Sequence, residues 1–175
     1  MANQIIITIG REYGSGGHEI AQKIAEHFGI NMYDRNLLDE YAQEQNQTNE
    51  DAVDELQFDY ISTKAAERES FVVVGRCAES VLRDRYNIVS IFITAKIEDR
   101  IKRIMRKYNI GDENEAISKI KRHDRTRRAY HDSHSDSEWR DAATYDLTIN
   151  SSKLGIEGTI DFLIGYIERI RNHNS

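Results

Sequence analysis

The chain has 175 residues, a formal net charge of −6 at neutral pH and a single cysteine, and 31% of its residues are charged. This size predicts one domain, residues 1–175, with a full hydrophobic core, and the acidic balance argues against a nucleic-acid partner. No apolar run approaches the roughly 20 residues that span a bilayer, and no secretory signal pattern is visible, so we expect no membrane partner and a cytoplasmic location. Cys77 has no partner for an internal disulfide and is expected to be a buried structural residue.

The first predicted elements are an apolar strand, a glycine-rich loop and a helix. Ile5–Ile9 form the strand, and apolar residues recur at helical spacing from Ile20 to Phe28. The loop glycines are Gly10, Gly14, Gly16 and Gly17. Glycines let the backbone wrap closely around an anion, and a helix N-terminus offers free N–H groups and a positive dipole. This order predicts a phosphate-binding loop; an ordinary glycine turn between a strand and a helix is the alternative.

The middle of the chain predicts three more helices and three more strands. Asn31–Tyr33 is a short strand that ends at Asp34, and a helix begins near Arg35. Residues 43–55 are acidic, rich in amides and weakly periodic, so we expect the most mobile or variable segment there, before a helix that ends near residue 69. The next strands are continuous apolar runs, as expected for strands covered on both faces. They are Phe71–Val74, which ends at Gly75-Arg76 and precedes a short helix, and Ile88–Thr94.

The C-terminal half is predicted to hold two basic helices, a last strand and a last helix. The first basic helix spans Lys96–Tyr108, with four apolar side chains expected to face inward: Ile97, Ile101, Ile104 and Met105. The second runs from about 114 to 128, and its segment Lys119–Arg128 holds six basic residues against one acid. Such a segment suits a small polyanion, and a solvated helix face is the alternative. Residues 131–140 are predicted to be a polar loop, and Leu147–Ile149 a fifth strand before an amphipathic helix.

Five apolar strands that alternate with helices predict an α/β fold: a five-stranded parallel sheet with helices on both faces. In such folds ligands bind outside the carboxyl ends of the strands. The polar residues expected at this edge follow the strands in turn. They are the loop from Gly10 to His18, Asp34-Arg35, Gly75-Arg76 and Asn150-Ser151. Their convergence favours a nucleotide-type ligand more than any single motif does.

With these motifs in place, the chain resembles the nucleoside monophosphate kinase superfamily, and most closely the cytidylate kinase-like family. The segment Gly10–Gly17 looks like a lysine-free version of that family's phosphate loop, and Val74–Cys77 resembles its acceptor-binding Gly-Arg. Ile120–Asp124, with the arginines that follow, is similar to its arginine-rich lid, and Tyr145–Asn150 to its last strand. The resemblance implies a P-loop kinase fold with an acceptor-side helical segment, about 35–69, and a short helical lid, about 112–140.

The resemblance also implies ATP and Mg²⁺ as cofactors and assigns roles to residues. Arg76 would bind the acceptor phosphate, together with Asp34 and Arg35 on the substrate side. Arg125, Arg127 and Arg128 would descend with the lid and stabilise the transferring phosphoryl group. The donor phosphates would be held by Gly10, Arg11, Tyr13, Gly14, Ser15, Gly16, Gly17 and His18. No side-chain pattern holds a metal directly, although Asp34 or Ser15 could reach Mg²⁺ through water.

The loop departs from the usual signature G-x-x-x-x-G-K-[ST]. Gly17 and His18 stand where the lysine and the hydroxyl are expected, and the segment from Gly10 to Gly16 is one residue too long. Arg11 is the first candidate to supply the missing charge, with a lid arginine second. Residues 43–57 are also too short for the separate acceptor domain of true cytidylate kinases, which leaves cytosine recognition open.

Several candidates also have an ordinary structural explanation. Arg76 could pair with a neighbouring acid, Asp34 could cap the helix that follows it, and a lid arginine could pair with Asp124. The histidines His123, His131 and His134 match no zinc spacing and are read as part of a solvated loop. Trp139 and Tyr145 are expected to be packing residues.

Two functions therefore remain in competition, beside a third, a nucleic-acid-associated protein that uses the helix over Lys119–Arg128, against which the overall acidic charge argues. The first is a phosphotransferase that moves a phosphoryl group from ATP to a nucleoside monophosphate or a similar phosphorylated metabolite. The second is a kinase fold that binds a nucleotide or phosphate as a sensor, without catalysis. The oligomeric state stays open, a homodimer included.

Overall fold

The structure is a computed structural model that describes residues 4–173, so the ends of the predicted domain 1–175 lie outside the described residues. Its centre is a parallel sheet with strand order β2-β3-β1-β4-β5. The strands are β1 (Ile6–Arg11), β2 (Asn31–Tyr33), β3 (Phe71–Val74), β4 (Ile88–Thr94) and β5 (Leu147–Asn150). The predicted five-stranded parallel sheet is confirmed. Because β1 pairs with β3 on one side and β4 on the other, the chain order reverses at β1, where such sheets form their ligand crevice.

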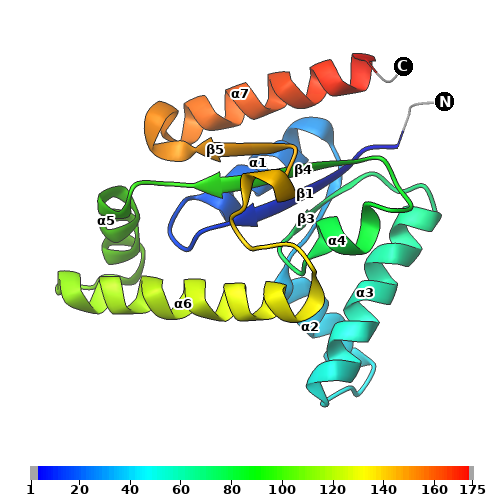
Figure 1. The fold of residues 1–175 in the computed structure, drawn as a ribbon, viewed down its shortest axis with the longest axis horizontal. Helices are drawn as coiled ribbons and strands as arrows, with labels where there is room; N and C mark the ends of the chain where they lie inside the picture. Colours follow the sequence, from blue (N-terminus) through cyan, green and yellow to red (C-terminus); the bar gives the residue numbers. More distant parts are fainter. Residues whose placement is uncertain (1–3, 174–175) are drawn as a thin grey trace.

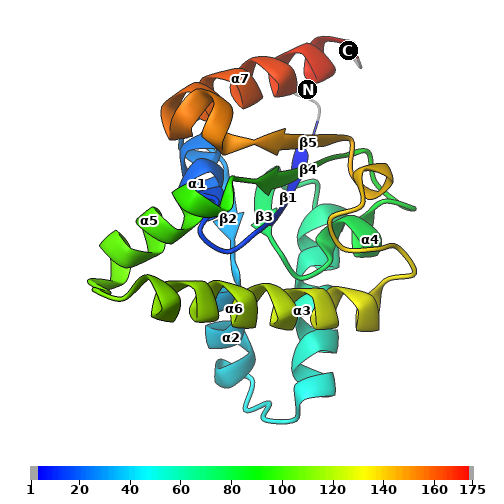
Figure 2. The same ribbon diagram turned by 60° about the vertical axis from the view of Figure 1, so that its left-hand side comes forward.

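Helices cover both faces of the sheet (Figures 1 and 2). On one face, Ile7 and Ile9 pack with α1 (Gly17–Phe28) and α7 (Ser151–His173). On the other, Ile6 and Phe71 pack with α2 (Arg35–Glu44), α3 (Glu50–Ala66) and α4 (Ala78–Leu82). Successive side chains of β1 pack on opposite faces of the sheet, because side chains alternate in direction along a strand.

Two further helices, α5 (Ile97–Tyr108) and α6 (Glu113–His134), pack against each other and against the loop after β1. Their shared apolar cluster consists of Tyr13, Ile101, Ile104, Ala116 and Ile120. Figures 1 and 2 show α6 as a long helix set apart from the sheet. Among residues 4–173, no helix has the length and apolar character needed to cross a membrane.

Three predictions about these elements were wrong at their boundaries. The strand predicted to end at Ile9 continues to Arg11, in register with Ile93 of β4. Helix α3 begins at Glu50, inside the segment expected to be variable, because the side chain of Asn49 caps it at Ala52 N. This helix buries only Gln57, Ile61 and Ala65, so its first turns carry no apolar stripe that a periodicity search could detect.

Helix α6 was predicted to end near Arg128, but it continues to His134. The reason is His131, which is 3% exposed and packs its ring against Glu79 of α4. The description of His131 as part of a solvated loop was therefore wrong. In α5, Ile101 and Ile104 face inward as predicted, whereas Ile97 is 42% exposed because it lies in the first turn, beyond the packed stripe.

Candidate functional site

The loop after β1 has the backbone expected of an anion cradle. Gly14 and Gly16 adopt positive φ angles of 81° and 84°, which favour glycine. Helix α1 begins at Gly17, and the first N–H to bond inside it is that of Ile20, 3.0 Å from the Gly16 carbonyl oxygen. The preceding N–H groups of a helix have no intrahelical partner. Gly17, His18 and Glu19 line the cavity, so this helix start is a suitable place for an anion.

The structure places the start of the loop signature at the end of β1. Gly10 and Arg11 both belong to this strand, in register with Phe92 and Ile93 of β4. From Gly10 to Gly16 the segment is one residue longer than G-x-x-x-x-G, whereas a count that begins at Arg11 gives the six positions of the signature. On that second count an arginine stands in the position of the first glycine.

Arg11 crosses over the helix start. A Cβ added at Gly17, where the usual lysine stands, would lie 2.6 Å from Arg11 Cβ, and one added at Gly75 would lie 2.7 Å from its Nη1. The guanidinium of Arg11 thus reaches from β1 to the end of β3, beside Arg76. Burial, followed by the charges of Arg127 and Arg76, lowers the pKa of Arg11 well below its ordinary value. An arginine stays charged at physiological pH, so this cluster has an electrostatic cost that an anion would relieve.

A single cavity of about 1170 Å³ joins this loop to the ends of the strands. Four predicted basic residues line it: Arg11, Arg35, Arg76 and Arg127. Burial lowers the pKa of Arg127 to about 10, and its Nη1 donates to the Arg11 carbonyl oxygen at 3.3 Å. The cavity brings together residues that lie more than 100 positions apart in the chain.

Arg76 is partnered and also faces the cavity. It has a positive φ of 60°, and its Nη1 donates to Gln57 Oε1 at 2.9 Å and lies 3.5 Å from Asp54 Oδ1. Its guanidinium stacks on the ring of Tyr130, 4.1 Å from the centroid. Gln57 is fully buried and in turn donates to Asp39 Oδ1 at 2.8 Å. These contacts hold Arg76 in one orientation, so the acid-pairing explanation and the binding explanation are compatible.

Asp34 serves two partners at the end of β2. Its Oδ1 accepts from the backbone N–H of Leu37 at 3.0 Å, which caps α2, and its Oδ2 lies 2.9 Å from His18 Nε2. Burial works in the opposite direction, but the hydrogen bonds from Leu37 and His18 keep the pKa of the Asp34 carboxyl below its ordinary value. Asp34 therefore caps α2, as predicted, and also lines the cavity. Ser15, the other residue considered for Mg²⁺, is buried, and its hydroxyl has no hydrogen-bond partner among the described residues.

The segment predicted to be a lid contacts the loop after β1. Asp124 Oδ1 accepts from the backbone N–H of Tyr13 at 2.8 Å, and the ring of His123 stacks on Tyr13 with centroids 4.0 Å apart. Asp124 is also bound by Arg100, which donates its Nε to the Tyr13 carbonyl oxygen at 2.8 Å. The loop and α6 are thereby joined through both the backbone and the side chain of Tyr13.

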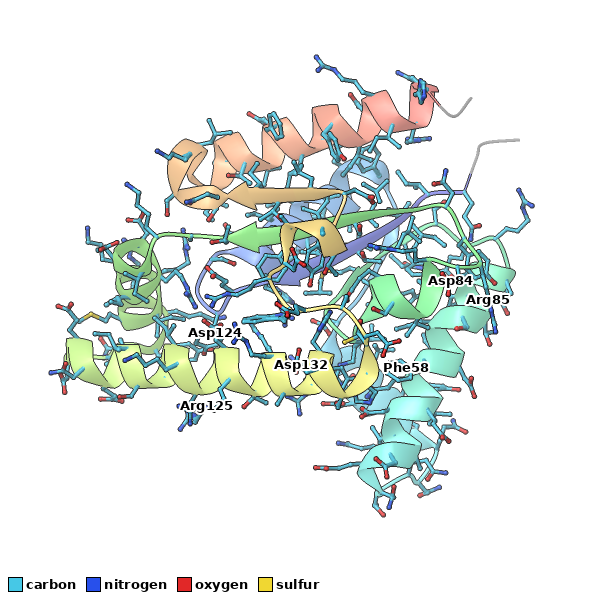
Figure 3. All side chains as sticks on the ribbon, in the orientation of Figure 1. Phe58, Asp84, Arg85, Asp124, Arg125 and Asp132 are labelled. Carbon is cyan, nitrogen blue, oxygen red and sulfur yellow. The ribbon has the colours of Figure 1, made fainter. Side chains whose placement is uncertain are left out.

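The three lid arginines have different positions. Arg127 lines the cavity, whereas Arg125 and Arg128 are exposed and are not among the described residues that line it. Figure 3 shows Asp124 on the side of α6 that faces the fold and Arg125 on the opposite side. Arg128 lies over Trp139, 5.9 Å from the ring centroid. The expected roles of Arg125 and Arg128 at the transferring group are not supported by these positions, because a helix separates neighbouring residues by about 100°.

Other predicted residues are peripheral or structural. Arg35 lines the cavity but is largely exposed, and its Nε is 3.3 Å from Asp39 Oδ2 one turn along α2. Ser15 does not line the cavity, unlike the neighbouring Gly14, Gly16, Gly17 and His18. Trp139 and Tyr145 pack on Phe92, as predicted, and Cys77 is buried.

Sequence reasoning missed the residues that support the site. Arg100 is 4% exposed and pairs with Glu12 at 3.5 Å as well as with Asp124. Arg103 donates to the carbonyl oxygen of Gly14 in the loop. Both lie on α5, whose basic character was noticed, but only the fold shows which basic residues turn toward the loop. Gln57 gave no signal at all, because a lone amide in a polar segment matches no motif.

The chain was then compared with known proteins. The family model described as the cytidylate kinase-like family matches residues 6–56 and 42–153. A cytidylate kinase from Pyrococcus horikoshii is 26% identical over 177 residues, which is 96% of this chain and 91% of that protein. The identity is low, but the match spans both chains almost completely.

Two solved structures place the fold. An uncharacterized protein from Eubacterium ventriosum is 43% identical, with a TM-score of 0.86 over 94% of this chain and 99% of that one. The shikimate kinase from Bacteroides thetaiotaomicron is 17% identical, with a TM-score of 0.58 over 94% of this chain and 98% of the other. The architecture is that of the P-loop kinases, as the order of strands and loop predicted.

Proposed function

The chain belongs to the cytidylate kinase-like family, and we propose that it transfers a phosphoryl group from ATP to a nucleoside monophosphate or a similar small phosphorylated acceptor. The observation that carries this proposal is the convergence of Arg11, Arg76 and Arg127 in one cavity with the glycine loop. Phosphoryl transfer requires two phosphates held in line and their charge neutralised, with little covalent chemistry from the protein. A glycine cradle with several guanidinium groups supplies both.

The residues divide between the donor and the acceptor side. The loop from Gly14 to His18 would bind the donor phosphates through backbone N–H groups. Arg11 would supply the charge of the missing lysine, since its side chain occupies the space over Gly17. Arg76, held by Gln57 and Tyr130, would bind the acceptor phosphate through its planar guanidinium. Arg127 would neutralise the charge that develops between them.

Magnesium is the metal expected with ATP, and the residues present fit it through water. It would neutralise and orient the donor phosphates when bound. Asp34 offers a carboxylate at the cavity, and its hydrogen bond with His18 fixes its orientation. Ser15 is a poorer candidate, because its hydroxyl is buried and the residue does not line the cavity.

A sensor without catalysis is the second candidate. Two observations favour it. Gly17 stands where the usual lysine is expected, and the proposed lid segment is already bonded to the loop through Asp124. A protein of this kind would bind nucleotide and release no ADP.

The test measures acceptor-dependent ADP release from ATP and Mg²⁺ across a panel of nucleoside monophosphates and other phosphorylated metabolites. We expect release with one acceptor class, its loss in Arg76→Ala, and a decrease of about a thousandfold in Arg127→Ala. Arg125→Ala is the matched control, because this arginine lies two residues away on the same helix but is exposed and does not line the cavity. Its turnover should stay near that of the wild type.

Two results would contradict the proposal. Nucleotide binding by calorimetry without release, for every acceptor tested, would favour the sensor. Equal losses in Arg125→Ala and Arg127→Ala would show that the inward position of Arg127 does not matter.

A further inference from the structure

A second group of reactive side chains lines the same cavity. Cys77 and Glu79 stand at the start of α4, and His131 stands in the last turns of α6. One ligand atom from each residue lies within 4.8 Å of the other two, and the residues are only 3–4% exposed. The proposed phosphoryl transfer uses none of them.

The backbone aims these side chains at one another. Cys77 has a positive φ of 48°, directly after Arg76 with a φ of 60°, and two such non-glycine residues in succession are uncommon. Strain of this kind persists only where the surrounding structure maintains it. Here it turns the thiol toward Glu79 and His131 while Arg76 faces Gln57.

The ring of His131 has the orientation that a metal ligand needs. Its Nε2 lies 3.2 Å from Glu79 Oε1, so Nε2 is the nitrogen that would bind an ion shared with Glu79. Its Nδ1 is buried, has no hydrogen-bond partner among the described residues, and lies 3.7 Å from Asp132 Oδ1. In metal sites one imidazole nitrogen binds the ion and the other faces a carboxylate. Asp132 stands in that second position.

We propose that Cys77, Glu79 and His131 bind one divalent transition-metal ion, with Zn²⁺ the best match, beside Arg76 in the cavity. Thiolate, imidazole and carboxylate together are ligands of zinc and its neighbours, whereas Mg²⁺ takes oxygen ligands with near-octahedral geometry. This site is therefore distinct from the magnesium expected with ATP.

Three protein ligands leave one position open in a tetrahedral site. All three residues line the cavity, together with Trp139 and Tyr145. The open position would accordingly be reached from the cavity by water or by an oxygen of a bound acceptor. A structural zinc site, by contrast, is usually closed by a fourth protein ligand.

The experiment uses the full-length protein, reduced and without an affinity tag, titrated with Co²⁺ as a spectroscopic substitute for Zn²⁺. Cys77 is the only cysteine in the chain, so a thiolate-to-cobalt charge-transfer band can arise from no other residue. We expect this band, with visible d–d bands of tetrahedral strength, to saturate at one Co²⁺ per chain and to disappear when Zn²⁺ is added.

Variants then assign the ligands. Cys77→Ser should lose the charge-transfer band, and His131→Gln and Glu79→Gln should weaken Co²⁺ binding at least tenfold, in line with the loss of a ligand or its support. His134→Gln is the matched control: it lies on the same helix and pairs with Asp54 at 3.2 Å, outside the cluster. Its titration should match that of the wild type.

The wild-type spectra decide the question even if a variant fails to fold. No charge-transfer band in the presence of excess Co²⁺ would overturn the proposal and leave His131 and Glu79 as a buried hydrogen-bonded pair beside a thiol. A band that persists unchanged in folded His131→Gln would also overturn it. Zn²⁺ should further raise the melting temperature of the wild type and not that of Cys77→Ser.

Discussion

At the scale of single residues, Arg100 supports the loop that we propose binds phosphate. This side chain is 4% exposed and bonds to the Tyr13 carbonyl oxygen, to Glu12 and to Asp124. Glu12 is 7% exposed, and its Oε2 also accepts from the backbone N–H of Ala95 at 3.1 Å. Arg100 is thus the buried partner of two shielded carboxylates. Arg140, which is more exposed, also pairs with Glu12 and lies 3.8 Å from Asp124, so it would be their remaining counter-charge if Arg100 were removed.

We predict that Arg100→Ala destabilises the protein by about 3 kcal/mol, the lower end for a buried ion pair that loses one partner, because Arg140 still faces both carboxylates. Urea unfolding followed by circular dichroism measures the free energy of unfolding. Arg125→Ala removes an exposed arginine and should change it by less than about 0.5 kcal/mol. Similar values for the two variants would show that the Glu12–Arg100–Asp124 contacts are not linked to stability.

At the level of elements, the contact between α6 and the loop includes the titratable ring of His123, which stacks on Tyr13. Burial, followed by the charges of Arg127, Lys119 and Arg122, lowers the pKa of His123 below its ordinary value of 6.5. The folded state therefore binds this proton less readily than the unfolded state. The contribution of this group to stability is fully present above its unfolded pKa, about 6.5, and is lost as the pH falls through its lower folded pKa. Protonation would place a cation among the three basic side chains while the ring stacks on Tyr13.

We therefore predict that acidification below about pH 6.5 weakens the stacking of α6 on the loop. Hydrogen exchange at the Tyr13 amide reports this directly, since that N–H donates to Asp124. After correction for intrinsic exchange rates, its protection should decrease between neutral pH and pH 5 in the wild type. In His123→Phe, which keeps an aromatic ring, this decrease should be smaller. An identical pH profile in both proteins would exclude His123 as the titrating group.

At the scale of the whole molecule, the cavity is lined by residues from both the N-terminal and the C-terminal half of the chain. Its walls come from the loop after β1, the ends of β2 and β3, and the helices α5 and α6. Helix α7 mainly covers the opposite region, where it packs on α1 and one face of the sheet. A ligand in the cavity should therefore order the first group of elements and leave most of α7 unchanged.

We predict that ATP raises the melting temperature, because a ligand that binds only the folded state stabilises it by mass action. In hydrogen exchange, protection should increase in residues 10–18 and in α6, and remain unchanged in the C-terminal half of α7. Adenosine is the control that lacks phosphates and should protect these residues much less. Equal protection by adenosine would indicate that the arginine cluster does not bind the phosphate groups.

Much of this protein is determined by local sequence. Continuous apolar runs such as Phe71–Val74 predict strands buried on both faces, and the placement of glycines after Ile9 predicts the loop. These signals identify the parallel sheet, the order of its elements and the edge that carries the site, because the ends of parallel strands meet there. They also predict the residues that line the cavity from the strand ends: Arg11, Asp34 and Arg76.

Only the tertiary structure decides which residues of α5 and α6 take part. Arg125 and Arg127 are the same residue type in the same basic segment, and no sequence pattern distinguishes them. Arg125 is nevertheless exposed, whereas Arg127 lines the cavity. The packing of Ala116 and Ile120 sets the rotation of α6 and decides this difference. His131 was read as solvated because no local pattern records that α4 lies next to it. Glu79 and His131 are 52 positions apart, so their contact depends on how α4 and α6 pack. For that reason the three side chains of the proposed metal site meet only in the folded chain.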